Sequence, residues 1–127
     1  MACSIYYDDN GFVRLEFSGI FDASDGGEIV REAAALLREK NSFRLLTDFR
    51  NATVRLSFGR VYNLPQMVRA WAGEEEMFIY QIKRALVTPA RYFDVFHFYE
   101  NVAVNRAQRL KVFLDMDEAK AWLLAEN

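Results

Sequence analysis

The last quarter of the chain constrains the fold most, because the spacing of its apolar residues changes from helical to alternating and back. Within residues 92–103 apolar side chains recur every three or four positions, as on one face of a helix. Within residues 109–114 every second side chain is apolar, which is typical of a strand with one face in water. Asp115 then stands where a helix N-cap is expected, ahead of a further helical pattern at 116–123. This alternation predicts an α/β protein.

The rest of the chain repeats the alternation of strands and helices. Two strands are expected over residues 4–8 and 12–20, joined by an Asn10-Gly11 hairpin turn. The other expected elements are a helix at 22–40 capped by Asp22 or Ser24, a strand at 43–49, a helix within 50–73 that Pro65 kinks or splits, a strand around 82–87, and a helix that begins at Thr88-Pro89. The order ββαβαβαβα predicts a five-stranded, mostly parallel mixed sheet in which only the first strand is antiparallel.

Charged residues at alternate strand positions indicate that the two faces of this sheet differ. Arg14, Glu16, Arg44 and Lys111 interrupt their strands in this way. Parallel strands that are buried on both faces would instead be continuously apolar. We therefore expect helices mainly on one face, and a second face that is polar or covered by another element.

The composition fits a single domain over residues 1–127 and excludes several classes of function. Hydrophobic residues make up 52% of the chain, which is enough for a core. The net charge is −2 and no basic block is present, so no nucleic-acid partner is expected. No apolar run reaches the roughly 20 residues of a membrane span, so we expect no membrane insertion. The single cysteine, Cys3, cannot form an intramolecular disulfide, which favours a cytoplasmic location.

Residue types for catalysis or metal binding are sparse. A structural zinc site takes about four Cys or His ligands, whereas this chain has one of each, Cys3 and His97. We interpret His97 as a helix-surface or partly buried side chain and Cys3 as a small buried or terminal one. The glycines of segment 25–28 match neither the dinucleotide-binding nor the P-loop pattern. We therefore expect no enzymatic activity, no cofactor and no metal.

Polar side chains at the predicted carboxyl ends of the strands are candidate site residues, because ligands of open α/β sheets bind there. Asp22, Thr88 and Asp115 each stand where a helix is expected to begin, and we interpret them as N-caps. Asp48 is expected to end a strand before a loop, where its carboxylate either holds loop N–H groups or faces a ligand or partner. The candidate binding edge consists of Asp48, Arg50 and Asn51.

Ser57 stands at the head of the second predicted helix. As an N-cap, its hydroxyl would accept a hydrogen bond from a backbone N–H. The same position at a helix N-terminus also favours a phosphate group. Both interpretations of Ser57 stay open from the residues alone.

A resemblance to a known family rests on three segments: LLTDFRNAT (45–53), FYENVAVNR (98–106) and RLKVFLDMDEAKAWL (109–123). They are similar to the small bacterial STAS-like proteins, a family named for sulfate transporters and anti-sigma factor antagonists. The order of elements matches along nearly the whole chain. The resemblance implies a four-turn βα superhelix that binds partners and is not an enzyme, with a distant relation to the CRAL-TRIO lipid-binding domains.

The same resemblance implies a phosphorylation site. Anti-sigma antagonists of the family carry Asp-Ser-Ser-Gly at the start of the second helix, and a partner kinase phosphorylates the serine. This chain has Leu-Ser-Phe-Gly at 56–59, in which Ser57 and Gly59 match while leucine and phenylalanine replace the aspartate and the second serine. Ser57 is therefore the candidate phosphorylation site.

Two functions of different classes follow. The first is a regulatory or protein-interaction module with an unidentified protein partner. Phe93 and Phe98, which lie outside the apolar stripe of the third helix, are its candidate interface and predict a homodimer. The second is a domain that binds a lipid or another small apolar ligand, with the apolar segment 62–80 as a lid over the strand ends. For that segment, ordinary core packing is the alternative.

Overall fold

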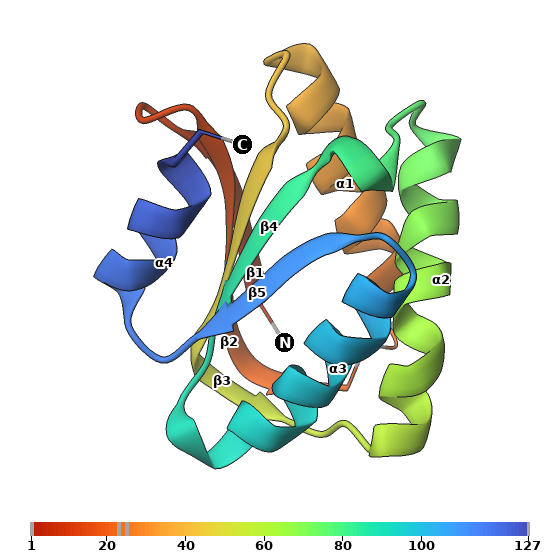
Figure 1. The fold of residues 1–127 in the computed structure, drawn as a ribbon, viewed down its shortest axis with the longest axis vertical. Helices are drawn as coiled ribbons and strands as arrows, with labels where there is room; N and C mark the ends of the chain where they lie inside the picture. Colours follow the sequence, from red (N-terminus) through yellow and green to blue (C-terminus); the bar gives the residue numbers. More distant parts are fainter. Residues whose placement is uncertain (1, 23, 25, 127) are drawn as a thin grey trace.

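A five-stranded sheet with the spatial order β1-β2-β3-β4-β5 forms the centre of the computed structural model, which describes residues 2–22, 24 and 26–126 (Figure 1). β1 pairs antiparallel with β2, and the remaining neighbours pair in parallel, so the predicted mixed sheet is confirmed. The strands are β1 (Ala2–Asp8), β2 (Phe12–Phe21), β3 (Arg44–Val54), β4 (Lys83–Val87) and β5 (Arg109–Phe113).

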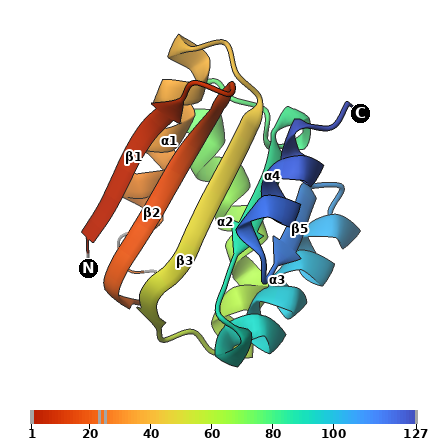
Figure 2. The ribbon, with the colours of Figure 1, turned by 90° about the vertical axis from the view of Figure 1, so that its left-hand side faces the viewer.

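Three helices connect the parallel strands and lie on one face of the sheet, which we call the helical face (Figure 1). Successive parallel strands are neighbours, and crossovers of one hand put every connecting helix on the same side. A fourth helix packs on the opposite face, over β3, β4 and β5 (Figure 2). The helices are α1 (Gly26–Glu39), α2 (Phe58–Glu74), α3 (Phe93–Asn105) and α4 (Met116–Leu124), with the short 3-10 turns η1 (Ile79–Gln81) and η2 (Ala90–Tyr92).

The core under the helical face centres on stacked aromatic rings. Phe49 of β3 lies between Phe17 of β2 and Phe96 of α3, with ring centroids 4.7 Å away on both sides. Phe21 meets both Phe17 and Phe49 edge-on at 5.0 Å. Both arrangements are favourable for aromatic quadrupoles. This cluster joins the two longest strands to α3.

The opposite face is partly covered and partly open. Ala119 and Leu123 of α4 are buried against sheet residues that include Leu46 and Val87. Lys83 of β4 holds the end of this helix, because its ammonium donates hydrogen bonds to the carbonyls of Trp122 and Ala125. Beside α4, this face is free of helices over β1, β2 and the part of β3 that α4 does not contact, and we call this region the open part of the face (Figure 2). The sequence predicted a second face that is polar or covered by another element. The structure has both: α4 covers one region, and the open region carries charged side chains.

Local turn and cap signals are confirmed at two places. Gly11 has φ +97° and donates a hydrogen bond from its N–H to the Asp8 carbonyl at 2.9 Å, which closes the β1–β2 hairpin. Asp115 accepts a hydrogen bond from the Glu118 N–H at 2.9 Å and caps α4.

Two predicted caps were wrong. The carboxylate of Asp22 accepts hydrogen bonds from the N–H and hydroxyl of Ser24, and α1 begins only at Gly26. Neither Asp22 nor Ser24 therefore immediately precedes the helix, and the residue that does lies outside the described residues. Thr88 is buried and its hydroxyl donates to the Pro89 carbonyl, while the η2 turn separates it from α3. The side chains of Asp22 and Thr88 therefore form hydrogen bonds with neighbouring residues and do not cap α1 and α3.

Of the two outcomes predicted for Pro65, a kink or a split of the second helix, the split does not occur. α2 runs without interruption through Pro65, which is buried. Proline removes one backbone N–H, and the packing of the helix tolerates this loss. Trp71, further along α2, contacts the first turn of α1, where a Cβ on Gly27 would lie 3.0 Å from the indole. The glycines of α1 thus allow the two helices to approach.

Candidate functional site

The predicted binding edge lies inside a strand, not at its end. β3 continues to Val54, so Asp48 does not precede a loop, and this prediction was wrong. The strand extends because β2 continues beside it, with Asn51 opposite Ser18 after a register shift. The polar residues at 48, 50 and 51 suggested that the strand ends there. Pairing with β2 instead extends the strand to Val54.

Asp48 is enclosed by two guanidinium groups on the open part of the face. It is 3% exposed, and its Oδ1 accepts hydrogen bonds from the backbone N–H and Nε of Arg50, both at 3.0 Å. Its Oδ2 lies 3.0 Å from Nη2 of Arg50 and 3.5 Å from Nη2 of Arg14. Arg14 also pairs with Glu16 at 3.1 Å. The carboxylate is therefore fully engaged within the protein and holds the strand pair together.

The charge of Asp48 depends on this enclosure. Burial by itself raises the pKa of the Asp48 carboxyl, but the hydrogen bonds and charge of Arg50, with the charge of Arg14, outweigh burial and hold the pKa below its ordinary value. The ionised form is thus the stable one at neutral pH. Arg50, whose side chain is 46% exposed, and Asn51, which is exposed, are the members of the predicted edge that could still meet a partner. Binding by this edge stays a prediction.

Ser57 caps α2, as predicted. Its hydroxyl oxygen accepts a hydrogen bond from the Arg60 N–H at 3.2 Å, and the residue is exposed. Two large aromatic side chains follow it on the outer side of the helix. Phe58 is 53% exposed and Tyr62 is 54% exposed. The hydroxyl of Ser57 therefore borders an apolar surface.

That surface extends onto α3. Phe58 meets the ring of Phe98 edge-on at 5.3 Å, and the guanidinium of Arg106 lies 5.1 Å from the ring centroid of Tyr62. We call Phe58, Tyr62 and Phe98 the α2 aromatic patch. Sequence reasoning named Phe98 as an interface residue but did not join it to Phe58 and Tyr62, although the spacing of four residues between these two puts both rings on one helix face.

The candidate interface of Phe93 and Phe98 was overstated. Both side chains are half-buried and pack against the main core, so they do not form an exposed apolar surface on α3. Phe93 stacks on His97 with ring centroids 5.3 Å apart. α3 packs against both β5 and α2, which makes its buried stripe wider than one helix face. Only Phe98 contributes to a surface, at the edge of the α2 aromatic patch.

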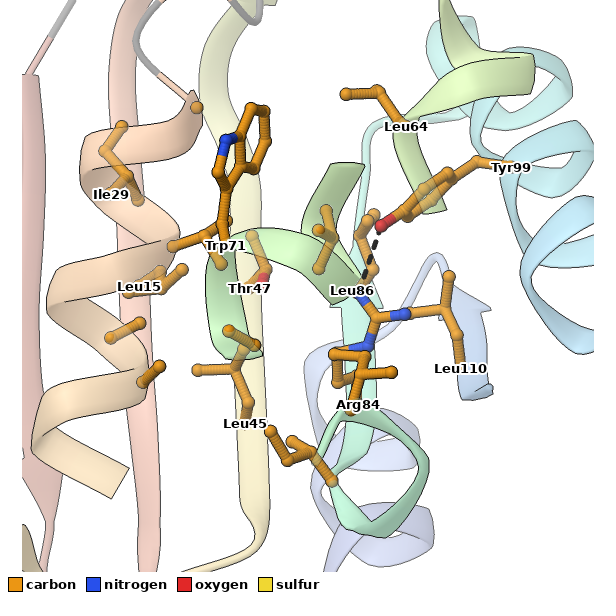
Figure 3. Close-up of a pocket in the computed structure, with 18 of the residues that line it drawn as sticks. Leu15, Ile29, Leu45, Thr47, Leu64, Trp71, Arg84, Leu86, Tyr99 and Leu110 are labelled. Carbon is orange, nitrogen blue, oxygen red and sulfur yellow. Dashed lines mark hydrogen bonds between the residues drawn. The ribbon is translucent and has the colours of Figure 1, made fainter. Parts of the chain in front are cut away.

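The segment 62–80 is a wall of the core and not a lid over the strand ends. It comprises most of α2 and the first part of the η1 turn, and runs along the helical face (Figure 1). Together with α1 and the sheet it encloses a cavity of about 120 Å³ (Figure 3). The lining is mainly apolar and includes Leu15, Ile29, Ala33, Leu45, Val68, Trp71 and Leu86.

One charged residue lines this cavity, Arg84 of β4. It is 5% exposed, and its Nη1 donates to the hydroxyl of Tyr99 at 3.0 Å while its Nη2 donates to Oε1 of Gln108. Gln108 in turn donates to the Pro65 carbonyl at 2.7 Å. Sequence reasoning missed Arg84, although the two charged residues Lys83 and Arg84 at the start of the apolar run of β4 were a visible signal.

The Cys3 thiol is unsuited to nucleophilic chemistry. Burial and the nearby charge of Glu32 raise the pKa of the Cys3 thiol to about 11, which keeps it protonated at neutral pH. His97 lies on the surface of α3, with Nε2 3.9 Å from Oε2 of Glu100. In the part of the chain that the structure describes, no three His, Cys, Asp or Glu side chains group as a metal site requires.

Comparison of the fold with solved structures gives a consistent result. The anti-sigma factor antagonist SpoIIAA in its unphosphorylated form superposes with a TM-score of 0.53 and 14% identity, over 98% of this chain and 100% of that one. SpoIIAA from Bacillus in its phosphorylated form gives a TM-score of 0.54 and 12% identity, over 95% and 98%. The fold is therefore STAS-like.

A third structure with this STAS-like fold belongs to an uncharacterised protein from Shewanella loihica PV-4 with a SpoIIAA-like fold. Its TM-score is 0.52 at 15% identity, over 96% of this chain and 92% of that one. No protein-family model matches the chain, and no curated protein matches its sequence. None of the described helices is long and apolar enough to cross a membrane.

Proposed function

We propose that this protein is a non-enzymatic regulatory module that binds another protein through the α2 aromatic patch and Ser57. The observation that carries the proposal is the exposure of Phe58 and Tyr62, each more than half accessible, beside an exposed hydroxyl at a helix N-terminus. Aromatic side chains are enriched in the cores of protein interfaces, and contiguous exposed apolar surface on a soluble protein marks contact sites. The patch therefore supports protein binding better than any catalytic role.

The similarity to SpoIIAA supports the same class of function. SpoIIAA is an anti-sigma factor antagonist whose structure is known in unphosphorylated and phosphorylated forms. In this chain Ser57 is exposed, so a kinase could reach its hydroxyl. A phosphate there would add negative charge at the border of the α2 aromatic patch and change which partner it accepts.

Replacing both Phe58 and Tyr62 with serine is expected to weaken partner binding about tenfold or more, because truncation removes the apolar centre of the contact. Binding is measured by capturing partners from the native host on the immobilised protein, then titrating the captured protein against each variant. Ser57→Asp tests the effect of charge in the same titration.

Phe78→Ser is the matched control, because Phe78 is 68% exposed and lies just before η1, outside the patch. It should bind like the wild type. Equal binding by the double variant and the wild type, with both folded by circular dichroism, would reject the patch as the contact surface.

We also propose that the protein forms a homodimer and that the contact is made by β1. Phe93 and Phe98, the interface expected from the sequence, are half-buried. β1 is an edge of the sheet and contains one charged residue, Asp8, so its outer side offers backbone groups to a second copy. Sedimentation at about 100 μM should show a dimer. Ser4→Lys, at an exposed position of β1, should shift it to monomer because an edge lysine opposes strand pairing. A monomeric wild type at that concentration contradicts the proposal.

A further inference from the structure

We propose that the cavity between α1, α2 and the sheet binds a small apolar monocarboxylate, with Arg84 as the counter-ion of its carboxylate. This ligand site is separate from the α2 aromatic patch and does not depend on it. Figure 3 shows the guanidinium of Arg84 among the side chains that line the cavity, opposite Trp71, Ile29 and Leu15.

The first observation is a buried charge without an acidic partner. Arg84 is 5% exposed, and its hydrogen-bond acceptors are the neutral oxygens of Tyr99 and Gln108. Its Nε is buried with no acceptor, and within the described residues no carboxylate forms an ion pair with it. Burying a charge costs several kcal/mol, and buried charges are normally paired.

Two other arginines of this protein, Arg14 and Arg50, pair with a carboxylate, that of Asp48. This one buried carboxylate serves both, on the opposite face of the sheet. Arg84 has no such carboxylate, although it is more buried than Arg50. A ligand carboxylate would supply the missing negative charge and accept from guanidinium N–H groups that have no acceptor.

The second observation is the space beside this charge. The cavity of about 120 Å³ is close to the ~150 Å³ of an engineered apolar cavity that binds benzene. Among the described residues, the other lining side chains with a polar atom are Thr47, Trp71 and Tyr99. One aromatic ring or a short alkyl chain therefore fits the walls, with a single polar group directed at Arg84.

The chemistry of the guanidinium selects a carboxylate. Its planar N–H groups match the two oxygens of a carboxylate. A phosphate monoester carries up to two charges and more oxygens, for which these apolar walls offer few donors. A neutral ligand would leave the charge of Arg84 uncompensated. The site is thus built for one negative charge attached to an apolar body.

Benzoate and hexanoate are the probes, and benzyl alcohol and hexanol are their neutral controls. Isothermal titration of the wild-type protein at about 10 mM ligand should show that at least one carboxylate binds about tenfold more tightly than its alcohol. Arg84→Gln should remove this preference while the alcohols bind as before. Absence of binding by both carboxylates, or equal binding of carboxylate and alcohol, overturns the proposal.

Ala33→Leu keeps the test decisive if Arg84→Gln does not fold. Ala33 is 2% exposed and lines the cavity, so a larger side chain fills the space without touching the charge. This variant should lose binding of carboxylates and alcohols alike. Carboxylate binding that is unchanged in Ala33→Leu would place the ligand on the surface and reject the cavity. Binding of partners at the α2 aromatic patch is read separately and should be unaffected.

Discussion

Replacing Phe49 with alanine is expected to lower the free energy of unfolding by about 3–5 kcal/mol. Phe49 is 4% exposed and stacks between Phe17 and Phe96, with a further edge contact to Phe21. The substitution removes the buried ring and leaves a cavity that the surrounding strands cannot close. Urea denaturation followed by circular dichroism measures the loss.

Phe78→Ala is the matched control for this substitution. It removes the same atoms from a side chain that is 68% exposed, so its free energy of unfolding should change by less than about 0.5 kcal/mol. If both variants lost the same stability, the aromatic stack would not be the centre of the core.

Asp48→Ala is expected to lower the free energy of unfolding by about 2–4 kcal/mol at pH 7. The substitution leaves Arg14, whose side chain is 11% exposed, without its buried carboxylate partner and removes the acceptor of the Arg50 N–H. The effect exceeds that of a surface ion pair because Asp48 itself is 3% exposed. A loss below about 0.5 kcal/mol in urea denaturation would show that the guanidinium groups are solvated without it.

The pH dependence of this effect has a definite sign. The pKa of Asp48 is lower in the folded protein than its ordinary value of about 3.9. Its stabilising contribution is therefore complete above that pH and is lost as the pH falls through the folded pKa. Asp48→Asn, which cannot ionise, should lie below the wild type in stability at pH 7 and approach it below about pH 4. A difference that stays constant over this range contradicts the ionic role.

The sequence by itself determined the class of fold, the order of its elements and several local signals. The Asn10-Gly11 turn and the Asp115 cap formed as predicted, since each depends on residues within four positions of each other. Alternation in segment 109–114 likewise located β5, because the two faces of a strand have different surroundings. The resemblance carried by three segments implied the STAS-like superhelix that the structure has.

The tertiary structure alone decided the features that join distant parts of the chain. β3 reaches Val54 only because β2 pairs with it, so Asp48 became an enclosed mid-strand carboxylate and not a loop residue. The half-burial of Phe93 and Phe98 depends on contacts of α3 with β5 and α2. Arg84 meets Gln108, which meets Pro65, across separations of 24 and 43 residues. The spacing of residues along a short segment carries no information about such pairs, because their members are far apart in the sequence and come into contact only in the folded chain.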